Sequence, residues 1–219
     1  MNFKGIIFDL DGTLADTLAD IAGSMNRVLV RYGYPLHEKE GYKLLVGRGL
    51  DTLVRQALPV EARQEDTIEK CLTAMMEDYN QNCLVETHLY TGVRELLDAL
   101  VQLNLKLAVF SNKSEPLTQR IVSKLMGDIP FIKVTGARAG FPKKPDPAGA
   151  LEISTLMKVP PEQMVYMGDS DVDMITANRA GMFAVGVRWG FRTEMELMQH
   201  GASLLISLPE ELLNVLIDK

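Results

Sequence analysis

The sequence has few of the residues that stabilise disulfide-rich or zinc-binding domains. Among its 219 residues are two cysteines, Cys71 and Cys83, which stand twelve positions apart with no CxxC pair or nearby histidine cluster. Neither a disulfide framework nor a zinc site is therefore indicated. No apolar run approaches the roughly 18 residues of a membrane-spanning helix, and the first residues do not resemble a secretion signal. We expect a soluble, cytoplasmic protein without a membrane partner.

Positive charge is also scarce in this sequence. It contains 23 lysines and arginines against 29 aspartates and glutamates, which gives a formal net charge of −6. Nucleic-acid binding depends on many Lys and Arg contacts to phosphates, so we expect no nucleic-acid partner. Hydrophobic residues make up 47% of the chain, which is enough to bury a core. The composition therefore predicts a folded globular protein of one or two domains.

Short apolar segments of strand length recur along the chain, separated in its second half by segments with apolar residues at helical spacing. The predicted strands cover residues 5–8, 105–110, 131–134, 164–167, 183–187 and 204–206. Strands that alternate with helices form a parallel sheet covered by helices on both faces. The sequence therefore predicts an α/β fold with a doubly wound parallel sheet.

The connection between the first two predicted strands is unusually long. It runs from Phe8 to Leu105, whereas a strand–helix–strand crossover needs only about a dozen residues. Its apolar residues recur at helical spacing, and we expect no strand between Phe8 and Leu105. We predict an α-helical cap domain at residues 15–87, inserted into an α/β core domain formed by residues 1–14 and 88–219. Ligands of open α/β sheets bind outside the carboxyl ends of the strands, so the insertion would stand over the binding crevice as a lid.

Polar residues follow four of the predicted strands. Taken alone, each group has an ordinary explanation as a turn, a helix start or a solvated loop. Because parallel strands present their carboxyl ends at one edge of the sheet, we expect the groups to converge. Asp9 and Asp11 are two apart on an extended segment and can face one reacting centre, with Asp169 arriving from a neighbouring strand.

The converging residues could together bind a divalent cation and the oxygens of a phosphate ester. Three carboxylates within the string GDSDVD repel one another unless a cation offsets their charge. Carboxylate oxygens from separate strands are ligands that Mg²⁺ prefers. The cation would also offset the charge of a phosphate dianion, while Lys144 and the Ser111 hydroxyl could bind its other oxygens. The sequence thus predicts Mg²⁺ as cofactor and a small phosphorylated metabolite as partner.

The strings FDLDGTLADT, VFSNK, KKPDP and GDSDVD, in that order, resemble the four motifs of the haloacid dehalogenase (HAD) superfamily of Mg²⁺-dependent phosphohydrolases. The resemblance implies a Rossmann-like core in which Asp9 is the nucleophile that forms an aspartyl-phosphate and Asp11 is the general acid and base. It implies that the metal is held by the Asp9 side chain, the Asp11 backbone carbonyl and Asp169, with Asp173 supporting these ligands. The residues that it implies for positioning the phosphoryl group are Thr13, Ser111, Asn112 and Lys144.

The helical insertion resembles the capped subclass of this superfamily. The cap loop Gly47-Arg48-Gly49 and the turn Trp189-Gly190-Phe191 are most similar to bacterial phosphoglycolate phosphatases. The expected substrate is therefore 2-phosphoglycolate, with a sugar phosphomutase like β-phosphoglucomutase or a pyrophosphatase as alternatives. Arg48 could clamp a substrate carboxylate from its flexible loop, although an ordinary surface arginine explains it equally well.

A phosphoryl-accepting signalling switch is an alternative from another class. Such receiver domains also use strand-end aspartates, Mg²⁺, a hydroxyl residue and a lysine on a doubly wound sheet. They lack a large helical insertion after the first strand. Asp11 also argues against a switch, because it would hasten the loss of the switch's own phosphoryl group. We therefore favour the enzyme.

Overall fold

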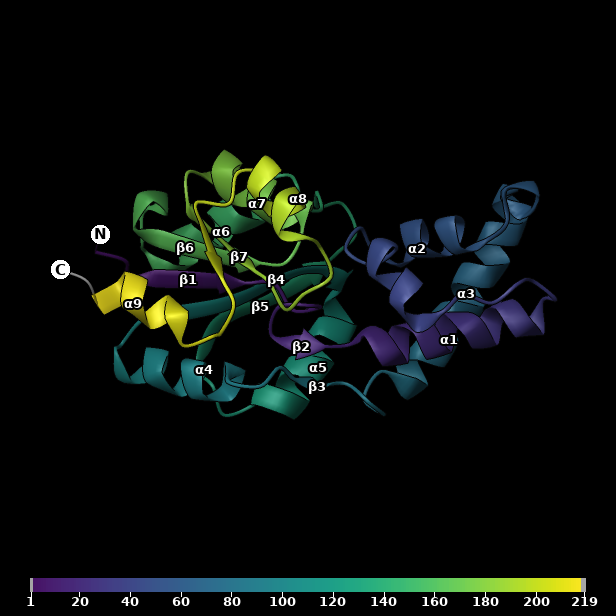
Figure 1. The fold of residues 1–219 in the computed structure, drawn as a ribbon, viewed down its shortest axis with the longest axis horizontal. Coiled ribbons are helices and arrows are strands. Elements are labelled where there is room, and N and C mark those ends of the chain that lie inside the picture. The colour runs from purple at the N-terminus through teal and green to yellow at the C-terminus, as the bar shows by residue number, and fades with distance from the viewer. Residues whose placement is uncertain (1, 218–219) are drawn as a thin grey trace.

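The computed structural model describes residues 2–217, in which six parallel strands form one sheet with the order β5-β4-β1-β6-β7-β8 (Figure 1). The strands are β1 (Gly5–Phe8), β4 (Lys106–Ser114), β5 (Phe131–Ala137), β6 (Met164–Gly168), β7 (Phe183–Val187) and β8 (Leu204–Ile206). Each neighbouring pair in this order is parallel. The α/β fold with a parallel sheet is thus confirmed.

Helices cover both faces of the sheet, with α4 and α5 on one side and α6 and α7 on the other (Figure 1). Successive side chains of a strand point to opposite faces, so β1 contributes to two separate cores. Ile6 and Phe8 join the core that contains Leu96 of α4, whereas Ile7 joins the core that contains Ile153 of α6. The helices are α4 (Val93–Gln102), α5 (Glu115–Met126), α6 (Ala148–Met157), α7 (Asp171–Ala180), α8 (Glu194–Gln199) and α9 (Glu211–Ile217).

Between β1 and β4 the chain forms a group of helices that extends beyond the sheet (Figure 1). These inserted helices are α1 (Leu18–Arg31), η1 (Lys39–Leu44), α2 (Leu50–Ala57), η2 (Val60–Ala62) and α3 (Glu65–Asn82). Helix α3 packs against both α1 and α2, and the packing buries Met25, Val54 and Met75. The apolar spacing of the sequence therefore corresponds to the buried faces of these helices.

The expectation that no strand lies between Phe8 and Leu105 was wrong. Two short strands, β2 (Ala15–Asp16) and β3 (His88–Leu89), pair in antiparallel fashion where the chain enters and leaves the inserted helices. A strand of two residues is too short to carry a periodic signal in the sequence. The pair places the two connections side by side.

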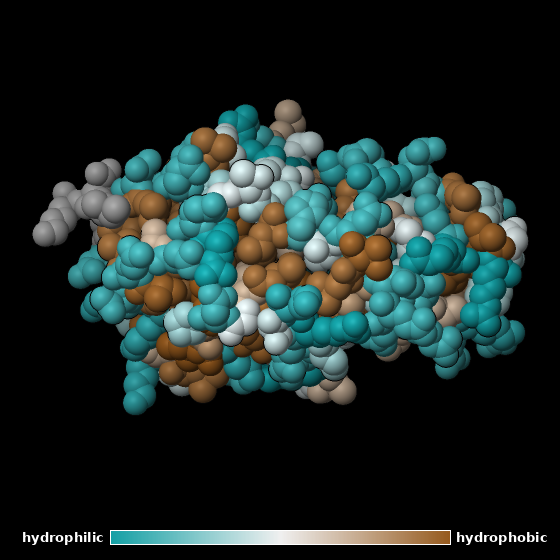
Figure 2. All heavy atoms as spheres, turned by 90° about the horizontal axis from the view of Figure 1, so that it is seen from below, coloured by the Kyte–Doolittle hydropathy of each residue, from teal (hydrophilic) through white to brown (hydrophobic). Residues whose placement is uncertain are grey.

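The surface is mixed in character. On the face shown in Figure 2, apolar groups are interspersed with polar side chains over the sheet region and the inserted helices. The most exposed large apolar side chains are Val60, Leu44, Val85 and Met195, which belong to different segments. Single exposed apolar residues of this kind are normal for globular proteins. Within residues 2–217, no helix is both long and apolar enough to cross a membrane.

A buried carboxylate on α1 holds the segment that returns from the inserted helices. Asp20 accepts hydrogen bonds from the backbone N–H groups of Val85, Glu86 and Thr87, at 3.1, 3.0 and 2.9 Å. The Thr87 hydroxyl donates a fourth, at 2.7 Å. Asp20 therefore fixes the second connection against the start of the first helix.

We predict that Asp20→Ala lowers the free energy of unfolding by about 2–4 kcal/mol, because it leaves several buried donors without an acceptor. Asp20→Asn keeps one acceptor oxygen and should lose less. Urea denaturation of both variants measures the effect. The control is Glu69→Ala on the exposed face of α3, for which we expect a change within about 0.5 kcal/mol. A loss in Asp20→Ala no larger than the control would contradict this role.

Candidate active site

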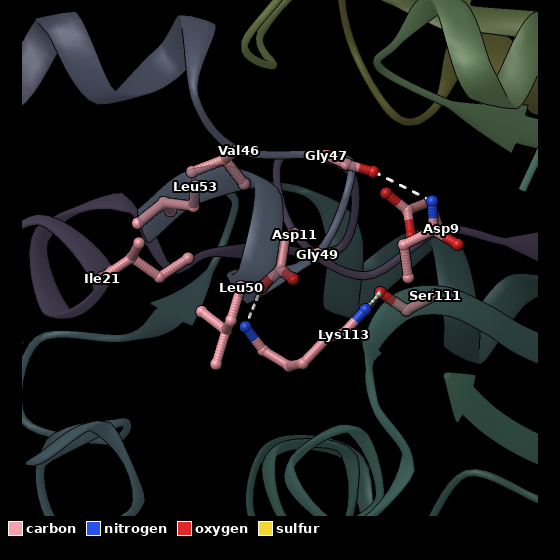
Figure 3. Close-up of a pocket in the computed structure, with 11 residues that line it drawn as sticks. Asp9, Asp11, Ile21, Val46, Gly47, Gly49, Leu50, Leu53, Ser111 and Lys113 are labelled. Atoms are coloured by element: carbon pink, nitrogen blue, oxygen red, sulfur yellow. Dashed lines mark hydrogen bonds and ion pairs between the residues drawn. The ribbon is translucent and has the colours of Figure 1, made fainter. Parts of the chain in front are cut away.

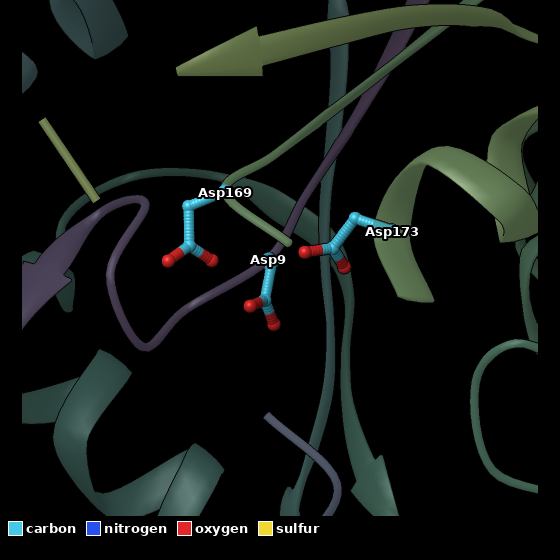
Figure 4. A group of neighbouring side chains, drawn as sticks. All are labelled: Asp9, Asp169 and Asp173. Atoms are coloured by element: carbon cyan, nitrogen blue, oxygen red, sulfur yellow. The ribbon is translucent and has the colours of Figure 1, made fainter. Parts of the chain in front are cut away.

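The carboxyl edge of the sheet brings three aspartates together. Asp9 directly follows β1 and Asp169 directly follows β6, and the pairing of Phe8 with Met167 sets the two side by side. Asp173 joins them from the first turn of α7. One oxygen of each carboxylate lies within 4.8 Å of the others, and all three residues are buried (Figure 4). Asp9 and Asp169 are thus close enough to share a cation, as the sequence predicted.

One lysine partly offsets the charge of this group. The Lys144 ammonium lies 2.8 Å from Asp9 Oδ1 and 2.7 Å from Asp173 Oδ1. Burial raises the pKa of Asp9 to about 7 despite the opposing effect of Lys144. Burial also raises the pKa of Asp169 well above its usual range, and the neighbouring Asp173 and Asp9 raise it further. Three oxygen donors facing one compensating charge suit a hard divalent cation such as Mg²⁺.

The loop after β1 passes close to Asp169 and depends on a glycine. The backbone carbonyl of Leu10 accepts hydrogen bonds from the N–H groups of Thr13, Leu14 and Ala15, which makes a tight turn. Gly12 in this turn has φ +84°, and a Cβ there would overlap the Asp169 carboxylate. The same turn places the Thr13 hydroxyl 3.5 Å from Asp169 Oδ1. Thr13 therefore contacts the carboxylate group in this structure.

A second turn fixes Asp169 from the other side. The backbone N–H of Phe191 donates to Asp169 Oδ2 at 2.7 Å. The indole N–H of Trp189 donates to the Thr13 carbonyl at 3.1 Å, which joins the turn to the loop after β1. Sequence reasoning used the Trp189-Gly190-Phe191 string only as a likeness and gave it no structural role. Its contacts orient the predicted metal ligand.

Asn112, at the end of β4, organises the loops around Asp9. Its side-chain oxygen accepts the Lys144 N–H at 2.9 Å, and its amide nitrogen donates to the Lys144 and Gly47 carbonyls, both at 3.0 Å. Asn112 therefore links the loop after β5 to the loop of the inserted helices. Ser111, the preceding residue, lines the same pocket as Asp9.

Asp173 is also held on both of its oxygens. The backbone N–H and the hydroxyl of Ser170 donate to Asp173 Oδ2, at 3.1 and 2.5 Å, in a capping box at the start of α7. Its other oxygen faces Lys144. The sequence string GDSDVD therefore does two things, because it begins a helix and supplies two of the three grouped carboxylates.

Asp11 points away from this group and toward the inserted helices. Its Oδ1 accepts from the Thr17 hydroxyl at 2.6 Å and lies 2.9 Å from the Lys113 ammonium. The Tyr79 hydroxyl of α3 is 2.9 Å from the same ammonium. Burial lowers the pKa of Lys113, but Asp11 and Tyr79 outweigh it, so its pKa lies above the ordinary value.

Sequence reasoning missed these partners of Asp11. The Thr17 side chain does not cap α1, and the backbone N–H of Leu18 instead donates to Asp16 Oδ1, at 3.1 Å. Tyr79 is fully buried and is also bonded to Lys113. Lys113 stands directly after Ser111-Asn112, and this adjacency was the one signal that could have identified it.

A pocket lies between the sheet edge and the inserted helices (Figure 3). The loops at the sheet edge contribute its polar side, which contains Asp9, Asp11, Ser111, Asn112 and Lys113. The inserted helices and their loop contribute Ile21, Val46, Gly47, Gly49, Leu50 and Leu53. The inserted helices thus cover the part of the sheet edge at which Asp9 lies.

Arg48 is placed differently from the expectation. Its guanidinium donates to Asp171 at the start of α7, and its side chain is half exposed. It is not among the residues that line the pocket, within the part of the chain that the structure describes. Its role in substrate choice stays a prediction.

Comparison with known proteins agrees with this geometry. Residues 6–187 match the model of the haloacid dehalogenase-like hydrolase family. The chain belongs to this family. A phosphoglycolate phosphatase of Pseudomonas putida is 32% identical to it over 205 residues, covering 92% of this chain and 75% of that protein. A phosphoglycolate phosphatase of Chromobacterium violaceum is 30% identical, covering 98% of this chain and 97% of that protein.

A solved structure is similar over the whole of this haloacid dehalogenase-like hydrolase. It is a crystal structure from Lactobacillus delbrueckii, provisionally assigned as a phosphoglycolate phosphatase, with a TM-score of 0.94 and 29% identity over all of both chains. The resemblance inferred from the sequence motifs is thus confirmed. Family and relatives together identify an enzyme, a phosphatase of the haloacid dehalogenase type.

We predict that Lys144→Met destabilises the metal-free protein more at pH 8 than at pH 5. Without the ammonium, the folded-state pKa of Asp9 rises further above its value in the unfolded chain. A carboxylate with a raised pKa favours folding while protonated and loses that contribution as the pH rises through this range. We expect the loss in free energy of unfolding, relative to wild type, to be about 1–3 kcal/mol larger at pH 8 than at pH 5.

Urea denaturation in EDTA at both pH values measures this difference. Lys70→Met, at an exposed position on α3, is the control, and its difference from wild type in free energy of unfolding should not change with pH. An equal loss for Lys144→Met at pH 5 and pH 8 would show that Lys144 does not stabilise ionised carboxylates.

Proposed function

We propose that the enzyme is a Mg²⁺-dependent phosphatase that hydrolyses a small phosphate monoester, 2-phosphoglycolate, through an aspartyl-phosphate on Asp9. The observation that carries this proposal is that Asp9, Asp169 and Asp173 lie together at the sheet edge, where Lys144 binds Asp9 and Asp173 and where Asp9 lines the pocket. The phosphoglycolate phosphatases among its relatives support the choice of substrate.

Cys71 and Cys83 are free and buried, which suits a reducing compartment such as the cytoplasm.

The proposal assigns residues 15–87 as the cap domain and residues 1–14 and 88–219 as the core domain. In this division the pocket lies between the two, with its apolar lining from the cap and its charged lining from the core. Binding a small ester there would exclude water from the reacting atoms.

The metal ligands in this proposal are the side chains of Asp9 and Asp169 and the backbone carbonyl of Asp11. Asp173 would support them through Lys144, which it shares with Asp9. These residues fit a hard cation because each offers an oxygen, and the grouped carboxylates carry more negative charge than Lys144 offsets. When bound, Mg²⁺ supplies positive charge that keeps the carboxylates ionised and offsets the phosphate dianion.

In the first step, a carboxylate oxygen of Asp9 attacks phosphorus while the bond from phosphorus to the ester oxygen breaks. Asp11 donates a proton to that oxygen, so the alcohol leaves neutral. The Lys144 ammonium and the Ser111 hydroxyl are placed to bind phosphoryl oxygens, with Thr13 and Asn112 holding the surrounding loops. The result is an acyl phosphate on Asp9.

In the second step, Asp11 accepts a proton from a water molecule that attacks phosphorus. The bond between phosphorus and the Asp9 oxygen breaks, and phosphate and free carboxylate are released. The bonds from Thr17 and Lys113 to Asp11 hold its carboxyl group on the side of the pocket from which the alcohol leaves.

We predict that, among 2-phosphoglycolate, glucose 1-phosphate and pyrophosphate, the enzyme hydrolyses 2-phosphoglycolate with the highest kcat/KM, and that EDTA abolishes the activity. Phosphate release with and without Mg²⁺ measures this activity.

Asp9→Asn should lower the rate of phosphate release at least about a thousandfold, because an amide cannot form the acyl phosphate. Asp66→Asn, at an exposed position on α3, is the control.

Other results of this experiment identify the alternatives. Conversion of glucose 1-phosphate to an isomer without phosphate release would indicate a phosphomutase. Preference for pyrophosphate would indicate a pyrophosphatase. Release of a single phosphate per protein molecule would indicate a signalling switch. Full turnover by Asp9→Asn would remove Asp9 from the mechanism.

A further inference from the structure

The alcohol part of the substrate has a restricted place in the pocket. In the proposed mechanism Asp11 donates a proton to the ester oxygen, so the leaving group has to lie on the Asp11 side. The inference below therefore rests on the proposed function. The residues that line this part of the pocket along with Asp11 are Ile21, Val46, Leu50, Leu53 and Lys113 (Figure 3).

Lys113 is a buried cation beside the position of the leaving group. Its side chain is 4% exposed and ends 2.9 Å from both Asp11 Oδ1 and the Tyr79 hydroxyl. An ammonium group carries three N–H donors, of which these two contacts use two. Figure 3 shows the side chain passing along the pocket, with its ammonium beside Asp11. One donor is therefore left for a ligand.

The distances bring a short acidic group within reach of this donor. An ester oxygen bonded to Asp11 lies about 2.5–3.0 Å from that carboxyl group. Since Lys113 Nζ lies 2.9 Å from Asp11 Oδ1, the ammonium is within about 6 Å of the ester oxygen. A carboxylate attached one carbon from the ester oxygen can bridge this gap with a charge-assisted hydrogen bond.

Arg48 is less suited to this role. Its guanidinium is bound to Asp171 at the start of α7, and its side chain is half exposed. Among the pocket-lining residues that the structure describes, Lys113 is the one with a positive charge. A carboxylate in the pocket would therefore meet Lys113.

The other side chains around the leaving group are apolar. The hydroxyl groups of a sugar would lie against Ile21, Val46, Leu50 and Leu53, none of which can donate or accept a hydrogen bond. A hydroxyl buried there without a partner loses the hydrogen bonds that it makes in water. This wall therefore disfavours polyhydroxy leaving groups and accepts the methylene groups of a short chain.

We propose that Lys113 determines specificity by binding the carboxylate of a short phosphorylated hydroxy acid, while the apolar wall formed by Ile21, Val46, Leu50 and Leu53 rejects sugar phosphates. Lys113 belongs to the string VFSNK, but the resemblance gave no role to it or to the apolar wall. Lys113 is close to Asp11, so substituting it also disturbs the proton-transfer group. A useful test must separate these two effects.

The test compares 2-phosphoglycolate with ethyl phosphate, which has a methyl group in place of the carboxylate. The ratio of the two kcat/KM values cancels damage to Asp11, because both esters need the same proton transfer. We expect a wild-type ratio of at least about 10, since a hydrogen bond to a charged group contributes about 1.5–3 kcal/mol. Lys113→Met should lower the ratio at least tenfold or bring it to about 1, and Lys113→Arg should restore part of it.

Arg48→Met is the matched comparison, and we expect its ratio to stay within about twofold of wild type. An unchanged ratio in Lys113→Met, or a collapse in Arg48→Met alone, would overturn the proposal. A wild-type ratio near 1 would also overturn it while leaving the phosphatase function intact. Failure of wild-type enzyme to hydrolyse either ester with Mg²⁺ would instead contradict the proposed function.

A binding measurement covers the case in which Lys113→Met is folded but too slow to assay. The probes are 3-phosphonopropionate and propylphosphonate, in which a methylene replaces the ester oxygen of each substrate. Calorimetry with Mg²⁺ should show wild-type enzyme binding 3-phosphonopropionate at least about tenfold more tightly. Lys113→Met should bind both alike, and a retained preference would count against Lys113. Circular dichroism verifies the fold of each variant.

Discussion

Repulsion between buried carboxylates is the constraint on which this structure depends. Parallel strands present their carboxyl ends at one edge, and that edge here places Asp9, Asp169 and Asp173 within 4.8 Å of one another. Lys144 supplies one positive charge to this group. Burial raises the pKa of Asp9 and of Asp169, and the neighbouring carboxylates raise both further, so the grouping suits a divalent cation.

The inserted helices form the second wall of this site. Their loop is bound to the sheet edge through the Gly47 carbonyl and Asn112, and their apolar residues form a wall of the pocket. Helix α3 reaches the acid and base candidate through Tyr79 and Lys113. The sheet edge thus contributes the charged lining of the pocket, and the insertion contributes its apolar lining.

Much of the fold was predictable because it depends on local patterns. Short apolar runs predict the buried strands, and apolar residues at regular spacing predict the helices. The convergence of Asp9 with Asp169 also followed, since parallel topology fixes which strand ends meet. Contacts such as Thr17 to Asp11, Tyr79 to Lys113 and Arg48 to Asp171 were not predictable. They depend on how the insertion sits over the sheet, and no local pattern encodes that orientation.

A crystal structure of the enzyme grown with Mn²⁺, which scatters anomalously and binds the same oxygen ligands as Mg²⁺, tests the central claim most directly. The account predicts one anomalous peak between Asp9 and Asp169, about 2.0–2.3 Å from an oxygen of each. It also predicts that the peak is lost in Asp169→Ala. A cation bound at another site, or no cation between these carboxylates at saturating Mn²⁺, would contradict it.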